Sequence, residues 1–392
     1  MTFEHILTLF NDTIARSSAG RELLLATGGA MLLFFFVQLW YYLSSYGRLH
    51  RFRNGVRTNA SSDPVSVIVV IRENTFYYIE NYLPLLLEQD YDEYEVVAVD
   101  CSYSEEIGEM LAGLAQRYPH LKTTRIKAQA NHKHSIKLAL TVGIKASSYE
   151  NLLFTTVDSF PVSEKWVSLM AKGFINGEVV LGYCGIEPRK GLANKWMRCS
   201  RLMTSVRYLS SAARGAVYRG IAHNIGYTKS LYFDHKGFDH LNMNIGDDDL
   251  FIAKIATRRN TSIVLHPKAT TRQLQYGGLC WWNSLCKYNS YAYRYYPAGI
   301  RWRTGLELLT RMLFFAAAGA LAVWLPTWWK ALPLGFVLIR LWIVEFKMRQ
   351  IIKRFGERKI LGSYVIYDLL SPASEFILAL NRRIRPNKAI WR

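Results

Sequence analysis

Hydrophobic positions near the amino terminus form one unbroken run. Between Glu22 and Arg48 there is no charged residue, and the sequence reads "LLLATGGAMLLFFFVQLWYYLSSYG". This run is longer than the ~20 residues that a bilayer-spanning helix needs. A signal peptide has a shorter apolar region followed by small residues at a cleavage site, whereas this run ends in aromatic residues. We therefore predict a membrane helix here.

Two further apolar runs lie close together near the carboxyl terminus. The first, "MLFFAAAGALAVWLPTWW", lies between Arg311 and Lys330, and the second covers residues 331–346. The second run carries Arg340 and Glu345, so it is less apolar than the first. A short Pro/Trp turn joins the two runs. We predict a hairpin of two membrane helices, which makes three membrane helices in the chain.

The middle of the chain shows a different pattern, in which short β-branched runs alternate with amphipathic stretches. The predicted strands are "VSVIVVI" (65–71), "EVVAVD" (95–100), "TTRI" and "NLLFTTVD" (151–158). Stretches with helical periodicity, such as "SEEIGEMLAGLAQRY" and "KHSIKLALTVGIKAS", lie between them. This alternation predicts an α/β fold with a doubly wound, mostly parallel sheet. Ligands of such sheets bind at the carboxyl ends of the strands.

Carboxylates stand where a ligand would be expected. Asp100 follows "VVAV", Asp158 follows "LLFTTV", and "GDDDLF" places Asp247, Asp248 and Asp249 side by side. Each has a structural alternative, because Asp caps helices and opens turns. Capping of a helix start would account for two of the three acids in "GDDDLF", so the third acid requires another explanation. Packing three carboxylates together raises the pKa of at least one of them, as a general base requires.

The charge of the chain is strongly positive, with a formal net charge of +19. The basic residues gather at one end of each apolar run: Arg48, Arg51, Arg53, Arg57, Arg301, Arg303, Lys347, Arg349, Lys353 and Arg354. The hairpin turn carries only Lys330. The positive-inside rule then places residues 48–304 and the carboxyl terminus in the cytoplasm, in a multi-pass protein of the inner (cytoplasmic) membrane. Nucleic-acid binding is disfavoured because no motif for it accompanies these residues.

These patterns divide the chain into four parts. We expect an amino-terminal segment with a membrane helix (1–47), followed by a cytoplasmic catalytic domain (48–304) that has an aromatic and basic interfacial segment near 279–304. The hairpin (305–346) and a basic tail (347–392) come next, and the tail contains a membrane-surface segment at 364–380. The five cysteines are scattered, with neither CxxC pairs nor zinc spacing, which is typical of reduced cytosolic thiols.

The order of these motifs resembles the family 2 glycosyltransferases, inverting enzymes with a GT-A fold, over residues 64–290. The first half, from "PVSVIVVIRENT" to "VVAVDCS", is similar to the nucleotide-binding half of the family. The segment "LLFTTVDSFP" resembles the one that carries the DxD element, and "GDDDLFIAKIA" resembles the acceptor-side motif. The membrane anchor and the terminal hairpin resemble a membrane-bound bacterial branch of the family.

The resemblance implies a role for particular residues. Asp100 would contact the uracil, and Glu73, Asn74, Lys137 and Lys287 would bind the rest of the nucleotide. Asp158 would bind Mg²⁺ or Mn²⁺, whose charge offsets that of the departing diphosphate. Asp248 would be the catalytic base, with Asp247 and Asp249 as alternatives. The implied activity moves a sugar from a nucleotide donor, expected to be UDP-linked, to a lipid or lipid-linked saccharide in polysaccharide or glycolipid synthesis.

Three positions depart from the family pattern. Thr156 replaces the first Asp of DxD, Thr75 replaces the acid of the "ARNE"-like turn, and "SLCKY" (284–288) stands for the QxxRW-like element. Lys287 keeps a positive charge there, but a lysine lacks the bidentate fork that arginine offers to a phosphate. A different function therefore competes with catalysis: a silent GT-A subunit that binds within a polysaccharide assembly complex.

Overall fold

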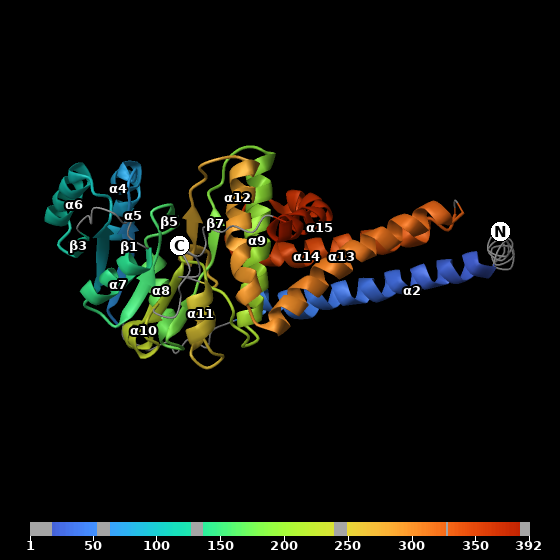
Figure 1. Cartoon of the computed structure of the whole chain (residues 1–392), viewed down its shortest axis with the longest axis horizontal. Helices are drawn as coiled ribbons and strands as arrows, with labels where there is room; N and C mark the ends of the chain where they lie inside the picture. The colour runs from blue at the N-terminus through green and yellow to red at the C-terminus, as the bar shows by residue number, and fades with distance from the viewer. Residues whose placement is uncertain (1–17, 53–62, 127–135, 239–248, 327, 385–392) are drawn as a thin grey trace.

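The computed structural model describes residues 18–52, 63–126, 136–238, 249–326 and 328–384. The molecule is elongated, with an α/β domain at one end and a bundle of long helices at the other (Figure 1). Asp247 and Asp248 lie outside the described residues, whereas Asp249 lies within them.

A seven-stranded sheet forms the centre of the α/β domain. Its order is β3-β2-β1-β4-β8-β6-β9. Neighbours run parallel except at β8, which is antiparallel to both β4 and β6. The doubly wound, mostly parallel sheet expected from the sequence is thereby confirmed. The strands are β1 (Val65–Ile71), β2 (Tyr94–Asp100), β3 (Leu121–Arg125), β4 (Asn151–Phe154), β6 (Val179–Leu181), β8 (Ile225–Thr228) and β9 (Thr261–Ile263).

The sheet is buried on both faces, as the continuous apolar runs predict for parallel strands. Along β1, Val67 and Val69 belong to one apolar cluster, and Ile68 and Val70 to the other. Helices α4 (Phe76–Asn81), α5 (Leu83–Leu87), α6 (Glu105–Arg117) and α8 (Trp166–Phe174) cover the first face. Helices α7 (Ile136–Ala146), α10 (Lys229–Asp234) and α11 (Asp249–Ile255) contribute to the second.

A second, three-stranded sheet lies beside the first, toward the helical end of the molecule (Figure 1). It has the order β5-β10-β7, where β5 is Ser159–Pro161, β10 is Thr271–Gln273 and β7 is Cys184–Ile186. Because β10 pairs antiparallel with β5, Gln273 lies opposite Ser159, next to Asp158. Asp158 was expected to end a strand, but β4 ends at Phe154. Asp158 therefore lies in the turn that connects the two sheets.

Helices α9 (Leu192–Ala212) and α12 (Leu279–Ser290) stand between the sheets and the helical bundle (Figure 1). The sequence reading did not predict α9, because its buried side carries polar residues. Arg198, Arg201 and Ser205 are all buried. The expected interfacial segment at 279–304 consists of α12, the 3₁₀ turn Tyr291–Tyr295 and the first residues of the next helix. A second 3₁₀ turn covers Pro267–Ala269.

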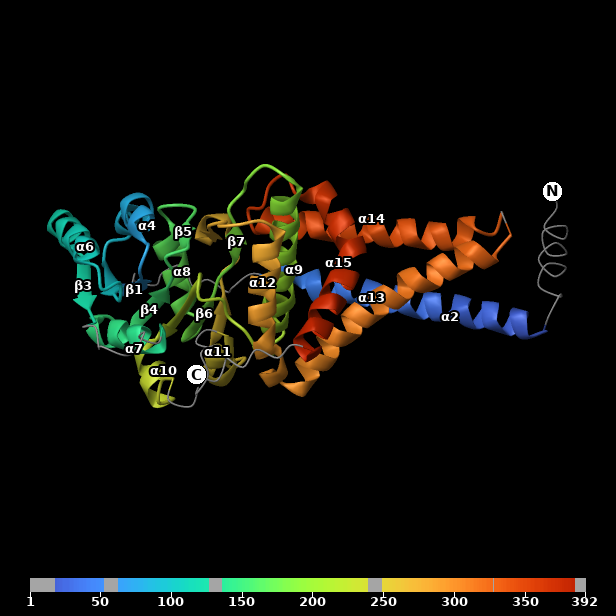
Figure 2. The same cartoon turned by 45° about the horizontal axis from the view of Figure 1, so that its top comes forward.

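Three long helices project together from the α/β domain: α2 (Ser18–Trp40), α13 (Ala298–Trp324) and α14 (Ala331–Arg354) (Figure 2). A π-helix (Tyr41–Tyr46) and α3 (Arg48–Arg51) continue α2. Phe35 of α2 packs against Phe314 and Phe336 of the other two helices. Within the described part of the chain, Glu22–Arg51 and α13 are long and apolar enough to cross a membrane. The crossing by α14, which is more polar, stays a prediction.

Buried charges join this bundle to the last helix, α15 (Leu361–Ile384). Arg340 is fully buried and faces the bundle, as its sequence context suggests. Its partners are Asp368 of α15 and the side-chain oxygen of Gln38, at 3.0 Å. Glu345, the nearest carboxylate in the same apolar run, lies closer in sequence, but the ion-pair partner is Asp368. A residue 28 positions away in sequence is brought into contact by the packing of α15 on α14.

Candidate active site

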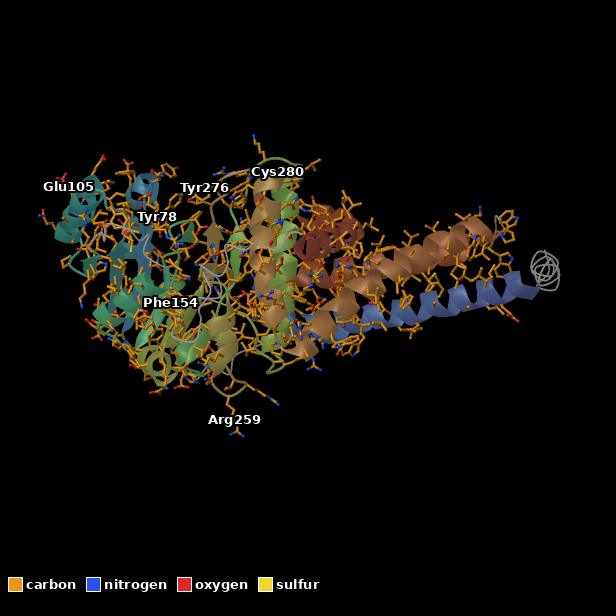
Figure 3. The ribbon with its side chains drawn as sticks, viewed as in Figure 1. Tyr78, Glu105, Phe154, Arg259, Tyr276 and Cys280 are labelled. Atoms are coloured by element: carbon orange, nitrogen blue, oxygen red, sulfur yellow. The ribbon has the colours of Figure 1, made fainter. Side chains whose placement is uncertain are left out.

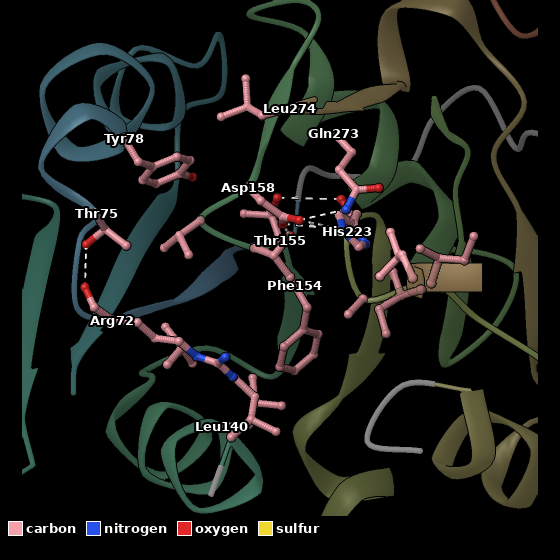
Figure 4. A pocket seen from close by; sticks show the side chains of 18 of the residues that line it. Arg72, Thr75, Tyr78, Leu140, Phe154, Thr155, Asp158, His223, Gln273 and Leu274 are labelled. Carbon is pink, nitrogen blue, oxygen red and sulfur yellow. Dashed lines mark hydrogen bonds and ion pairs between the residues drawn. The ribbon is translucent and has the colours of Figure 1, made fainter. Parts of the chain in front are cut away.

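A cavity of about 880 Å³ opens where the two sheets meet, within the size range of small-molecule sites. Its walls come from the turn after β1, from α7, from the β4–β5 turn, from β8 and β10, and from α9 and α12 (Figure 4). Polar lining residues include Arg72, Glu73, Asn74, Lys137, Asp158, Arg201, Arg219, His223 and Gln273. The cavity therefore lies beyond the carboxyl ends of β1 and β4, where this type of sheet binds ligands.

Asp158 lies at the centre of this cavity, with a side chain that is 28% exposed (Figure 4). Thr156 Oγ1 donates to its Oδ1 at 2.5 Å, and Gln273 Nε2 donates to its Oδ2 at 2.7 Å. His223 Nε2 lies 3.3 Å from Oδ1. Burial alone would raise the pKa of Asp158, but His223 and the two hydrogen bonds hold it well below its usual range. The carboxylate is therefore ionised at neutral pH.

His223 and Asp158 together could supply two ligands to a divalent cation. Carboxylate oxygen suits Mg²⁺ and Mn²⁺, and an imidazole nitrogen also binds transition metals. Among the described residues there is no group of three His, Cys, Asp or Glu side chains that could hold a metal. The residues present fit a cation whose remaining ligands are diphosphate oxygens and water, which is how Mg²⁺ is commonly bound.

The turn after β1 brings two predicted nucleotide-binding residues to the cavity, Glu73 and Asn74. Asn74 has φ 61°, a left-handed conformation that Asn tolerates better than most residues. Thr75 stabilises the turn by donating to the Arg72 carbonyl at 2.7 Å (Figure 4). The threonine that replaces the family's acid thus has a structural role. Lys137 of α7 lines the same cavity.

Asp100 and Lys287, also predicted to bind the nucleotide, do not line this cavity. Asp100 is buried at the end of β2, where its Oδ1 accepts hydrogen bonds from the backbone and the hydroxyl of Ser102. Arg125 Nε lies 3.4 Å from its Oδ2. Asp100 does not cap α6, because Ser104 does so. Lys287 lies on α12 beside Tyr288 and Asn289, which do line the cavity.

Of the three adjacent acids, the model describes Asp249, the first residue of α11. Asp249 is buried and accepts a hydrogen bond from Tyr296 Oη at 2.5 Å. Burial raises the pKa of Tyr296 well above its usual range, and Asp249 raises it further although Arg219 opposes this. Tyr296 therefore stays protonated and donates to Asp249. This contact gives Asp249 a structural role at the start of α11.

Besides Arg72 in the turn after β1, sequence reasoning missed four of the polar cavity residues named above: Arg201, Arg219, His223 and Gln273. Arg201 Nη2 donates to Gln273 Oε1, and the amide of Gln273 donates to Asp158, so one side chain connects the arginine to the carboxylate. These residues come from α9, from the loop before β8 and from β10, which no local motif links. The only sequence signal was the run "RCSRLMTSVR", whose arginines recur at roughly helical spacing.

Comparison with solved structures identifies the fold. The mannosyltransferase PcManGT from Pyrobaculum calidifontis, solved with GDP-Man and Mn²⁺, superimposes with a TM-score of 0.54 at 16% identity, over 90% of this chain and 99% of that one. The chain therefore has the GT-A glycosyltransferase fold. S. aureus TarS (residues 1–349) matches with a TM-score of 0.40 at 15% identity, over 82% of this chain and 91% of that one. That score is too low to assign a fold. No protein-family model matches the sequence, and no curated protein does.

Proposed function

We propose that this protein is a membrane-anchored glycosyltransferase that takes its sugar from a nucleoside diphosphate donor. The observation that carries the proposal is Asp158, an ionised carboxylate at the ligand edge of a GT-A sheet, inside a cavity of about 880 Å³. A divalent cation, held by Asp158 with His223 as a second ligand, would offset the charge of the departing diphosphate. A UDP-sugar is the first donor to test, and GDP-mannose, the ligand in the PcManGT complex, is the second.

The reaction needs a base on the acceptor side of the cavity. An acceptor hydroxyl oxygen forms the new bond to the anomeric carbon, while the bond from that carbon to the diphosphate breaks. The hydroxyl proton passes to a carboxylate, for which we propose Asp248, and the nucleoside diphosphate leaves with the bonding electrons. We propose that Arg72 and Lys137, which both line the cavity, bind phosphate or ribose oxygens of the donor. Attack from the opposite face would invert the anomeric carbon.

A screen of nucleotide sugars on the purified full-length protein tests this function. We expect one donor to be hydrolysed or transferred in the presence of membrane lipids and Mn²⁺ or Mg²⁺. We expect Asp158→Ala to weaken nucleotide binding and to remove its dependence on the cation, as measured by calorimetry. Donor binding without turnover would favour the silent subunit of an assembly complex. Binding that is equally metal-dependent in Asp158→Ala would contradict the metal assignment.

We propose further that the catalytic domain faces the cytoplasm, where nucleotide sugars are made, and that the acceptor is a lipid or lipid-linked saccharide. Cys280, the exposed native thiol on α12, provides a test (Figure 3). A membrane-impermeant thiol reagent should label Cys280 only after cells are lysed. A cysteine placed at Trp328, in the exposed hairpin turn, should be labelled on intact cells. Labelling of Cys280 on intact cells would overturn the orientation.

A further inference from the structure

A second cavity, of about 360 Å³, lies between the first cavity and the membrane bundle. Its walls are α9, α12, the 3₁₀ turn after α12, the first turns of α13 and the later part of α15. Arg201, Arg219 and Asn289 line both cavities. The two spaces therefore adjoin, and these side chains form the boundary between them.

Arg201 gives the boundary a positive charge without a carboxylate partner in the described part of the chain. The residue is 4% exposed; it donates to the amide oxygen of Gln273 and lies 5.3 Å from the ring centroid of Trp282. Its Nε is buried and has no hydrogen-bond partner among the described residues. Burying a charge costs desolvation free energy unless an opposite charge lies beside it. An anion bound next to Arg201 would offset this cost.

Arg207 lines the same cavity about two turns further along α9 and, in contrast to Arg201, is paired with carboxylates. Its guanidinium binds Glu307 at 2.8 Å and Glu375 at 2.9 Å. Carboxylates thus lie near the cavity, and among the described residues none of them pairs with Arg201. The positive charge of the cavity is consequently concentrated at its inner end, next to Asp158.

The opposite end of the cavity is apolar and faces the membrane bundle. Leu308 of α13 and Leu378 and Ala379 of α15 line it. Helix α15 also exposes a series of large apolar side chains: Ile366, Leu369, Leu370, Phe376, Ile377 and Leu380. Such a helix is typical of a segment that lies in the membrane surface. The cavity is therefore amphipathic, with its cationic end toward the active site and its apolar end toward lipid.

We propose that this second cavity is the acceptor site, and that its ligand is a membrane lipid with a phosphate group that binds against Arg201 and Arg219. The assignment rests on the proposed glycosyl transfer. Arginine is suited to this role because its planar fork binds phosphate oxygens bidentately. Through Gln273, Arg201 is held in a fixed position relative to Asp158, so the lipid headgroup and the sugar donor would meet at the boundary of the two cavities.

Photo-crosslinking of the full-length protein in phosphatidylcholine nanodiscs tests the site. The probes are a twelve-carbon alkyl phosphate with a terminal diazirine and the corresponding neutral alcohol. We expect the phosphate probe to crosslink to α12, α13 or α15 at least tenfold more efficiently than the alcohol. Millimolar inorganic phosphate should not displace it, because the alkyl chain supplies part of the affinity. Equal crosslinking by the alcohol, or displacement by inorganic phosphate, would overturn the proposal.

Two pairs of variants locate the effect. Arg201→Gln should lower crosslinking at least tenfold, whereas Arg259→Gln, which removes an exposed arginine that lines neither cavity, should change it less than twofold (Figure 3). Gly305→Leu should fill the cavity, since a Cβ at Gly305 meets open space and the residue lines the wall. Gly319→Leu, on the same helix and with equal space, is the matched control.

Nucleotide binding separates this proposal from the proposed function. We expect Gly305→Leu to bind nucleoside diphosphate with Mn²⁺ as wild type does while losing the lipid probe. Normal probe crosslinking in Gly305→Leu would overturn the cavity assignment. If Arg201→Gln lost nucleotide affinity but kept probe crosslinking, Arg201 would belong to the donor site instead. If nucleotide failed to bind the wild-type protein while the probe still crosslinked, glycosyl transfer would be wrong and the lipid site would stand.

Discussion

Buried charges occur in two regions of this molecule, and the two regions treat them differently. At the junction with the bundle of long helices, each buried arginine has a carboxylate: Arg311 lies 3.2 Å from Asp368 and 3.4 Å from Glu307, and Arg340 also binds Asp368. Around the cavities, Arg201 has an amide and an aromatic ring as its neighbours. Asp158 is bound by His223, Thr156 and Gln273, and part of its side chain stays exposed in the cavity. The arginines of the first region are therefore paired with carboxylates, whereas Arg201 has no carboxylate partner in the described part of the chain.

The difference distinguishes charges that organise the fold from charges that bind. A closed ion-pair network fixes how helices cross, because removing one partner leaves another charge buried. A buried charge that has no opposite charge beside it is stabilised when a phosphate or a cation binds there. Four substitutions test this distinction, two in each class of site.

The largest effect is expected at the acidic segment before α11. Asp248→Asn should lower the transfer rate by ~10²–10⁴, the usual contribution of a general base, and leave nucleotide affinity nearly unchanged. Steady-state kinetics with the donor found in the screen, together with calorimetry, would measure both. A rate within about threefold of wild type would exclude Asp248 as the base.

The next effect concerns the closed network. Asp368→Asn removes the carboxylate shared by Arg311, Arg340 and Tyr42, and should lower the free energy of unfolding by about 3–5 kcal/mol. Denaturant unfolding in detergent micelles would measure it. Combining Arg340→Met with Asp368→Leu should restore most of the loss. Glu345→Gln, on the same helix as Arg340 and with no ion pair in the described part of the chain, should change stability by less than about 1 kcal/mol.

A smaller effect is expected where the two regions meet. Tyr296→Phe removes the hydroxyl that donates to Asp249 and should lower the free energy of unfolding by about 1.5–3 kcal/mol, as for a hydrogen bond to a charged group. If Asp249 is structural, the transfer rate should stay within about threefold of wild type. A hundredfold fall in rate with unchanged stability would instead identify Asp249 as part of the chemistry.

The smallest effect is a dependence of stability on pH at Asp158. The folded-state pKa of Asp158 is depressed below the unfolded value of ~3.9, so the unfolded chain binds the proton more readily. Its contribution to stability, about 1 kcal/mol, is complete above that value and is lost as the pH falls below it. Asp158→Asn should therefore be less stable than wild type at pH 7, and the gap should close toward pH 3. A gap that is independent of pH would mean that the charge is not stabilised in the folded state.

Much of the architecture could be read from local patterns. The strands β1 and β2 were predicted from their β-branched runs, α6 from its amphipathic stretch, and the two most apolar long helices from run length, because these features depend on neighbours in sequence. The same reasoning placed Asp158 at the ligand edge of the sheet, whereas Glu73 and Asn74 came from the resemblance to family 2 glycosyltransferases. The altered "SLCKY" motif pointed to Lys287, which does not line the first cavity, and missed Arg201, which does.

Periodicity, run length and residue type are local properties, and they were enough to predict the fold class and the position of the apolar helices. Which charges meet depends on the packing of the folded chain. Gln38, Arg340 and Asp368 come from three separate helices, and Asp158, Arg201 and Gln273 come from a turn, a helix and a strand of the second sheet. Such contacts depend on how elements pack at long sequence separation, and no local pattern records whether a buried arginine will find a carboxylate.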